Sequence, residues 1–269
     1  MSDSHPGAAE SGVAPAESAE DPTSRGRFAL PGWLEFPLLV IGAFLVAFLV
    51  KTFLVQAFYI PSGSMENTLQ VGDRVLVNKL VYHFRPVERG DIIVFDGTGS
   101  FVSAEAAVPQ PGILQSIVRG LGEIVGLAPP KDTDFIKRVI GVSGDHVVCC
   151  DAQGRITVNG VALDEEDYLY GNNPPSKQPF DVLVPDGKLW VMGDHRSASA
   201  DSRSHMGEPG GGFVPVDHVI GRAFAVVWPP GRMQFLEIPA TFQQPGLSAL
   251  AADGTPAVVA EEARTWSLQ

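Results

Sequence analysis

The sequence predicts a mostly β domain, preceded by one membrane-spanning helix. The β domain is predicted because short runs rich in β-branched residues recur along the middle of the chain, with Gly, Asp and Asn between them. The helix is predicted from residues 37–60, an apolar run with Lys51 as its single charge. The roughly 175 residues after this run are enough for one domain of ordinary size.

The apolar run has the length of a transmembrane anchor, which we place at residues 32–60. Twenty-four helical residues reach about 36 Å, enough to cross a hydrocarbon core of about 30 Å with some tilt. The run is too long for a cleaved signal peptide, and no small-x-small site follows it. Arg25 and Arg27 precede it, which favours a cytoplasmic N-terminus and an extracytoplasmic domain on the plasma membrane.

The two ends of the chain carry most of the net charge of −12. Residues 1–31 are rich in Ala, Ser, Gly, Pro and Glu, a composition typical of a disordered tail. Residues 236–269 show no hydrophobic pattern and are predicted to form a largely flexible tail, with the docking of one strand or helix fragment left open. The sequence contains no basic stripe, which argues against nucleic acid as a partner.

Seven runs in the middle of the chain are predicted to be strands. They are residues 71–79, 91–95, 134–140, 156–158, 181–184, 188–192 and 219–228. Asn159 and Gly160 follow the fourth run and form a hairpin signal. Many short strands with turn residues between them are typical of a sandwich or a partly closed barrel.

Residues 97–132 are interpreted as an insertion, because this stretch is long and rich in Gly and Pro. Within it, residues 113–126 carry apolar side chains at helical spacing. The helix would lie either on the membrane surface near the anchor or over one end of the sheet. The sequence does not decide between these positions.

Ser64 is the candidate nucleophile. It lies in the segment PSGSM at residues 61–65, between the apolar run and the first predicted strand. Pro61 and Gly63 favour a tight turn that exposes a hydroxyl group and directs backbone N–H groups to one point. A serine nucleophile needs such donors, because attack produces an oxyanion. Taken alone, the five residues are more typical of an ordinary surface turn.

Lys137 is the candidate general base, since it shares one face of a predicted strand with Phe135 and Val139. Desolvation by apolar neighbours lowers the pKa of a lysine. At the reference pKa of about 10.4 the amine is protonated at pH 7, whereas at a pKa of about 8 it can accept a proton from serine. Taken alone, a lysine on a strand is more typical of a solvated edge.

Residues 193–203 form a polar segment directly after the apolar run 188–192. The segment contains two acids, two arginines and three serines. Asp–Arg pairs hold loops together through bidentate hydrogen bonds, so a structured loop is expected here. Its serines can also hold a lysine amine in position.

These blocks, in this order, resemble the bacterial type I signal peptidases, the membrane-bound serine/lysine endopeptidases that remove signal peptides. The resemblance covers about residues 35–230 and begins with the apolar anchor. The blocks are PSGSM at 61–65, GDRVLVNK at 72–79, RGDIIVF at 89–95, FIKRVIG at 135–141, and Gly193-Asp194 followed by SADSR at 199–203. Each block alone is a weak signal, but five in order after an anchor are specific.

The resemblance implies a fold and a class of substrate. The fold would be an antiparallel β-sheet catalytic domain over residues 61–235, with a small β subdomain inserted at about 141–186. The substrates would be exported preproteins, whose signal peptides bind as an extended strand with small residues at the first and third positions before the cut. The lipid bilayer would be the other partner.

The resemblance also assigns roles to individual residues. Ser64 would be the nucleophile and Lys137 the general base. Ser62 would give its hydroxyl group, and Ser64 its backbone N–H group, to the oxyanion hole. Ser199 would orient the Lys137 amine. The loop would be supported by Asp194, Asp201 and Arg203.

Two positions depart from the family pattern. Asn67 stands where the family usually has Pro, and it is expected to loosen the turn after the nucleophile. His195 stands where the family usually has Asn, which raises the alternative of a histidine base. Lys137 is preferred as the base because it stands in its complete block.

No cofactor or metal ion is predicted. His146 and His195 have no Cys or carboxylate at the spacing of metal ligands, and the sequence has no glycine-rich phosphate loop. Cys149 and Cys150 are neighbours, so they form either a strained disulfide or two free thiols.

Two other classes of function stay open from the sequence. One is a self-cleaving serine/lysine regulator, which would need an internal cleavage site with small residues and usually carries a DNA-binding module. The other is a membrane-anchored β domain that binds peptides without cutting them. For that domain, Ser64→Ala and Lys137→Ala would leave function intact. The oligomeric state is not predicted.

Overall fold

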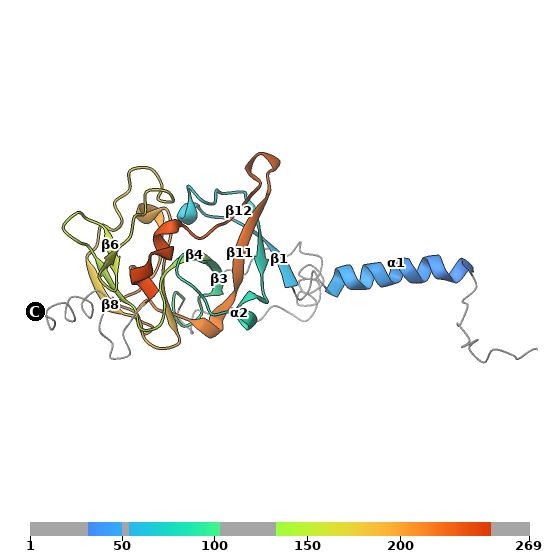
Figure 1. The fold of residues 1–269 in the computed structure, drawn as a ribbon, viewed down its shortest axis with the longest axis horizontal. Helices are drawn as coiled ribbons and strands as arrows, with labels where there is room; N and C mark the ends of the chain where they lie inside the picture. The colour runs from blue at the N-terminus through green and yellow to red at the C-terminus, as the bar shows by residue number, and fades with distance from the viewer. Residues whose placement is uncertain (1–31, 50–53, 103–132, 249–269) are drawn as a thin grey trace, which may run out of the picture. The chain divides into compact units, whose positions relative to one another are not determined.

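The computed structural model of the chain describes residues 32–49, 54–102 and 133–248 (Figure 1). The chain divides into two compact units, Met1–Leu45 and Val46–Gln269. Three sequence-based predictions lie outside the described residues: the acidic tail 1–31, the helix 113–126 and the last part of the C-terminal tail, 249–269.

Helix α1, Gly32–Leu49, carries the first part of the predicted anchor. It contains Pro37, and large apolar side chains such as Phe36 and Leu39 are about three-quarters exposed. Within the described ranges, no helix has both the length and the apolar character needed to cross a membrane.

The prediction of one helix from residue 37 to residue 60 is wrong in its second part, because Val55–Tyr59 form strand β1. This strand pairs antiparallel with β2, Arg74–Asn78, from Val55 opposite Asn78 to Tyr59 opposite Arg74. Valine and aromatic residues suit a strand as well as an apolar helix, so the pairing partner decides the conformation.

The main sheet is antiparallel throughout, and the prediction of a mostly β, antiparallel fold is confirmed. Its strand order is β1-β2-β11-β3-β4-β9-β10. β12 pairs with β11, next to which it is drawn in Figure 1. A one-turn helix, α2 (Val81–Phe84), follows β2. The other strands are β3 (Ile92–Asp96), β4 (Asp134–Gly141), β9 (Lys188–Met192), β10 (Val214–Pro215), β11 (Val219–Trp228) and β12 (Gln234–Phe235).

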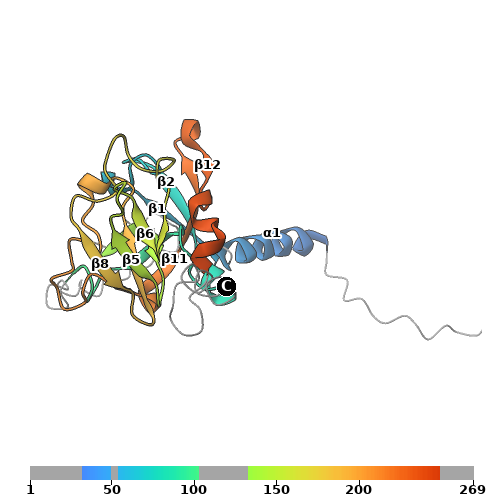
Figure 2. The ribbon, with the colours of Figure 1, turned by 60° about the vertical axis from the view of Figure 1, so that its left-hand side comes forward.

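A second, four-stranded sheet is formed by the chain between β4 and β9, two strands that pair directly with each other. Its strands β5, β6 and β8 lie side by side in Figure 2. They are β5 (His146–Cys149), β6 (Ile156–Val158), β7 (Val161–Ala162) and β8 (Phe180–Leu183). The Asn159-Gly160 turn joins β6 to β7, and both residues have positive φ angles, as the hairpin signal predicts.

Cys149 and Cys150 lie at the end of β5 and are joined by a disulfide bond. The peptide bond between them is cis. Cys149 is buried and Cys150 is exposed.

The hydrophobic core connects the two sheets. Trp190 and Met192 of β9 and Ile140 of β4 belong to the same buried cluster as Val147 and Phe180 of the second sheet. Gly141 at the end of β4 lies against this cluster, and a Cβ atom there would clash with Val147. The small sheet is therefore packed tightly onto the strand that carries Lys137.

Up to residue 248, the segment after β12 packs against the domain, which corrects the prediction of a flexible tail for these residues and agrees with the docked fragment that the sequence left open. Leu236, Phe242 and Leu247 are buried, and the last two form two short 3₁₀ helices with their neighbours, Ala240–Gln243 and Pro245–Ser248. Gly90, which has a φ of 85°, leaves room for Phe242. Burial of these apolar side chains fixes the segment, although its sequence shows no regular pattern.

Candidate active site

Ser64 lies on a single 3₁₀ turn, Gly63–Met65, which follows β1. Met65 is completely buried and anchors the turn in the core of the main sheet. Ser64 itself is 7% exposed. The backbone N–H groups in the first turn of a helix have no partner within the helix, so the Ser64 N–H group is available to a bound group.

Lys137 lies on β4, where it is paired with Ile93 of β3. Its side chain is buried, and its Nζ atom lies 2.8 Å from Ser64 Oγ and 3.0 Å from the Ile136 carbonyl oxygen. Burial lowers the pKa of Lys137 to about 8, and the charges of Asp201 and Asp194 oppose this shift. The site therefore brings a serine hydroxyl group into contact with an amine that is partly neutral near pH 8.

His195 contacts the turn that carries Ser64 through its ring and its backbone. Nδ1 lies 2.9 Å from Glu66 Oε2 and 3.2 Å from the Gly63 carbonyl oxygen. The His195 backbone N–H group donates to the Ser64 carbonyl oxygen at 3.1 Å. The Lys137 amine therefore contacts Ser64 Oγ, whereas the His195 ring contacts Glu66 and the Gly63 carbonyl oxygen.

Asn67 has a φ of 84°, which asparagine tolerates and which the ring of proline forbids. Its Nδ2 group donates to the Leu169 carbonyl oxygen at 3.1 Å. We expected Asn67 to loosen the turn after Ser64. Instead, its hydrogen bond attaches this turn to the segment between β7 and β8.

Ser62 and Ser199 both lie near Ser64, Ser62 along the chain and Ser199 across Gly193. Ser62 is extended, exposed and immediately precedes the 3₁₀ turn. Ser199 Oγ is buried, and a Cβ atom on Gly193 would clash with both Ser199 Oγ and the Ser64 carbonyl oxygen. The hydrogen bonds of the Lys137 amine go to Ser64 and Ile136, so the role of Ser199 in orienting it stays a prediction.

The loop 193–203 is held by two Asp–Arg pairs. Asp201 binds Arg203 through two hydrogen bonds of 2.8 and 2.7 Å and accepts the Gly193 N–H group at 3.0 Å. Asp194 binds Arg138 of β4, with hydrogen bonds of 2.8 and 2.6 Å. Thr68, four residues after the nucleophile, donates to Asp194 at 2.5 Å. Asp194 thus links the loop to the turn of Ser64 and to the strand of Lys137.

The sequence comparison agrees with this geometry. The sequence model of the family described as signal peptidase, peptidase S26, matches residues 33–228. The chain belongs to this family. The prediction of a signal peptidase, and hence of a serine endopeptidase, is confirmed.

Several curated members of the signal peptidase family are similar over most of the chain. The probable signal peptidase I of Mycobacterium leprae is 39% identical, over 74% of this chain and 77% of that protein. Signal peptidase I of Mycobacterium tuberculosis is 37% identical, over 86% of this chain and 83% of that protein. The probable signal peptidase I-2 of Synechocystis is 36% identical, over 76% and 77%.

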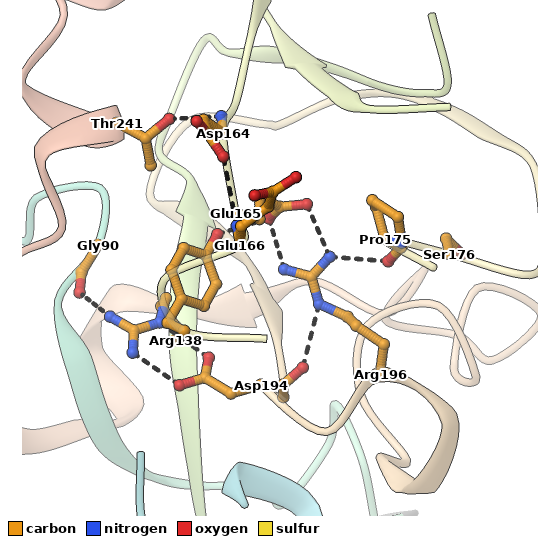
Figure 3. Close-up of polar contacts among 12 residues, drawn as sticks. Gly90, Arg138, Asp164, Glu165, Glu166, Pro175, Ser176, Asp194, Arg196 and Thr241 are labelled. Atoms are coloured by element: carbon orange, nitrogen blue, oxygen red, sulfur yellow. Dashed lines mark hydrogen bonds and ion pairs between the residues drawn. The ribbon is translucent and has the colours of Figure 1, made fainter. Parts of the chain in front are cut away.

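This signal peptidase also has a buried charge network that sequence reasoning missed (Figure 3). Arg196 binds Glu165 at 3.0 and 2.5 Å, and Tyr168 donates to the same carboxylate at 2.5 Å. The Arg138 guanidinium lies 4.4 Å from the Tyr168 ring centre. Glu165 lies 31 positions before Arg196, so no local sequence pattern predicts this ion pair. Among the described residues, no group of three or more His, Cys, Asp or Glu is placed to hold a metal ion.

We expect the rate of cleavage by this signal peptidase to rise with pH through about 8. The pKa of Lys137 is lowered to about 8, so the amine is mostly protonated below this pH and mostly neutral above it. If the neutral amine is the base, kcat/KM should increase about tenfold between pH 7 and pH 9. The measurement is kcat/KM against pH, with circular dichroism at each pH as a control for folding. A rate that falls over this range contradicts the lysine base.

Proposed function

We propose that this signal peptidase uses Ser64 as nucleophile and Lys137 as general base to cut signal peptides from exported preproteins. The observation that carries the proposal is the 2.8 Å separation between Lys137 Nζ and Ser64 Oγ. Burial supports it, because Lys137 is 3% exposed and the lowered pKa makes the neutral amine accessible near neutral pH.

In the proposed reaction, neutral Lys137 takes the Ser64 hydroxyl proton while Ser64 Oγ attacks the carbonyl carbon of the scissile bond. The Ser64 N–H group and the Ser62 hydroxyl group donate to the oxyanion that forms. The Lys137 ammonium then gives its proton to the leaving amine, and a water molecule, again deprotonated by Lys137, hydrolyses the acyl-enzyme. The charges of Asp201 and Asp194 favour the ammonium form while it exists.

We propose that the substrate binds as an extended strand along β1. This strand is at the end of the described main sheet, and the chain runs from its last residue, Tyr59, through Ile60 and Pro61 to Ser62. A peptide added to a sheet edge gains main-chain hydrogen bonds, and every second side chain points into the enzyme. This arrangement explains why small residues at the first and third positions before the cut would be selected.

We propose that residues 32–49, as helix α1, belong to a single membrane anchor, with the catalytic domain on the extracytoplasmic side of the plasma membrane. The apolar run in the sequence supports this, as do the exposed apolar side chains of α1. Large apolar side chains in water carry a cost of roughly 25 cal/mol per Å², which a lipid environment removes. Arg25 and Arg27 before the run support the orientation.

A cleavage assay with a preprotein tests the proposed function. The detergent-solubilised full chain should cut a preprotein at one site, where alanine occupies the first and third positions before the cut. Mass spectrometry of the products identifies this site. Replacing the alanine before the cut by leucine should slow cleavage more than tenfold, because a pocket for a small side chain excludes a larger one.

The outcome also separates the alternatives. Binding of the preprotein without any product would contradict the proposal and favour a peptide-binding domain. Cleavage of the enzyme's own chain, with the preprotein left intact, would instead favour a self-cleaving regulator.

A further inference from the structure

His195 contacts the nucleophile turn at two points, and the proposed reaction leaves it without a role. Its ring Nδ1 lies 3.2 Å from the Gly63 carbonyl oxygen, and its backbone N–H group donates to the Ser64 carbonyl oxygen at 3.1 Å. These are the carbonyl groups directly before and directly after the Ser64 Cα atom. One residue of the loop therefore holds the backbone on both sides of the nucleophile.

The partners of Nδ1 determine which ring nitrogen carries the proton. Nδ1 faces a carbonyl oxygen of Gly63 and, at 2.9 Å, a carboxylate oxygen of Glu66. A carbonyl oxygen and a carboxylate only accept hydrogen bonds, so Nδ1 must carry the proton and donate. Glu66 therefore fixes the Nδ1–H form of His195, in the neutral ring as well as in the charged one.

The His195 ring is also fixed in orientation. It lies against Tyr170, with ring centres 4.1 Å apart, and its side chain is only 16% exposed. The Glu66 carboxylate lies so close to Gly63 that a Cβ atom there would be 2.9 to 3.0 Å from it. Glycine at residue 63 therefore allows Glu66 to reach His195 across the turn.

The Gly63 carbonyl group belongs to the same peptide unit as the Ser64 N–H group. We propose that His195 is a positioning residue that fixes this peptide plane and strengthens Ser64 N–H as a donor to the oxyanion. A hydrogen bond to the oxygen of an amide polarises the unit and makes its N–H group a better donor. The inference rests on the proposed function, since it assigns His195 to the oxyanion side of the same reaction.

Comparing the asparagine and glutamine variants tests the inference. The amide nitrogen of asparagine can take the place of Nδ1, whereas that of glutamine reaches the place of Nε2. His195→Asn should therefore keep kcat within about threefold of wild type, while His195→Gln and His195→Ala should lower kcat about tenfold with KM little changed. This loss is smaller than the 10²–10³-fold typical of removing an oxyanion donor outright, because the Ser64 N–H group is still present.

The measurements are kcat and KM for preprotein cleavage, together with the melting temperature of each full-length variant. The same substitutions at His146 are matched controls, since His146 also contacts a carboxylate, Asp181, but is 45% exposed. His146→Asn and His146→Gln should leave kcat unchanged.

Three results would overturn the inference. His195→Gln could cleave as fast as His195→Asn, His195→Ala could match wild type, or the losses in kcat could follow the losses in melting temperature. Failure of the proposed function would give a different result, because neither wild type nor Ser64→Ala would then cleave the preprotein. That result would also overturn the inference about His195.

Discussion

Replacing either Ser64 or Lys137 with alanine should lower kcat for preprotein cleavage by about 10⁴- to 10⁶-fold. The two side chains lie 2.8 Å apart, and in the proposed reaction they act on one proton, so neither would work without the other. The double variant should therefore be no slower than the slower single variant. Strong non-additivity of this kind is typical of residues that act as one unit.

The measurement is single-turnover cleavage with enzyme in excess, which detects very slow rates. Lys177→Ala is the matched control, since Lys177 is exposed, and it should cleave at the wild-type rate. Lys137→Arg keeps the positive charge but has no neutral form near pH 8, so it should be as inactive as Lys137→Ala. Retention of more than about 1% of activity in Lys137→Ala would show that another group is the base.

Six of the seven predicted runs agree with strands of the structure to within one residue at each end, whereas the first run, 71–79, begins three residues before β2. The bounds of β6, β9 and β11 agree with the predicted runs 156–158, 188–192 and 219–228. In these strands apolar and polar residues alternate, or nearly all residues are apolar, and turn residues flank each strand. β5, β10 and β12 were missed. β10 and β12 have two residues each and exist only through pairing with β9 and β11.

The largest error in the fold prediction concerns the end of the apolar run. A continuous apolar sequence is typical both of a membrane helix and of a buried strand, and periodicity alone cannot separate the two. Val55–Tyr59 become a strand because β2 offers a partner along their full length. Strand β2 follows the turn that carries Ser64, so a sequence window limited to the apolar run does not include this partner.

In the candidate site, too, local sequence predicted some features, and others depend on contacts between distant residues. Ser64 and Lys137 were proposed from local chemistry and from the order of the motif blocks, but nothing local predicts the contact between two residues separated by 73 positions. The Asp–Arg pairing within the loop was expected, and Asp201 does bind Arg203. The partner of Asp194 was not expected, because Arg138 lies on β4, 56 positions before Asp194, and no local pattern joins the two.

Asp194→Asn should destabilise the catalytic domain by about 3–5 kcal/mol, the usual cost of breaking a buried ion pair. Arg138 is 2% exposed and Asp194 is fully buried, so the Arg138 charge would be left without compensation. Thr68 would also lose a charged acceptor. For a domain of this size, the melting temperature should fall by roughly 10 °C.

Thermal unfolding of the full-length protein in detergent measures this effect. Asp151→Asn is the matched control, because Asp151 also binds an arginine, Arg155, whose side chain is 48% exposed, and its melting temperature should not change. The double variant Arg138→Met/Asp194→Leu should recover part of the loss, since it removes both buried charges together. An Asp194→Asn protein with the same melting temperature as wild type would contradict a stabilising role for the Arg138–Asp194 pair.

The same substitution should also change the pH dependence of the enzyme that remains folded. The Asp194 charge raises the pKa of Lys137 and so opposes the lowering that burial causes. Without that charge the ammonium form loses a stabilising neighbour, and the pKa of Lys137 should fall below about 8. The rise of kcat/KM with pH should therefore occur at lower pH in Asp194→Asn than in wild type. An unshifted profile, together with a lowered melting temperature, would mean that Asp194 stabilises the fold without acting on the base.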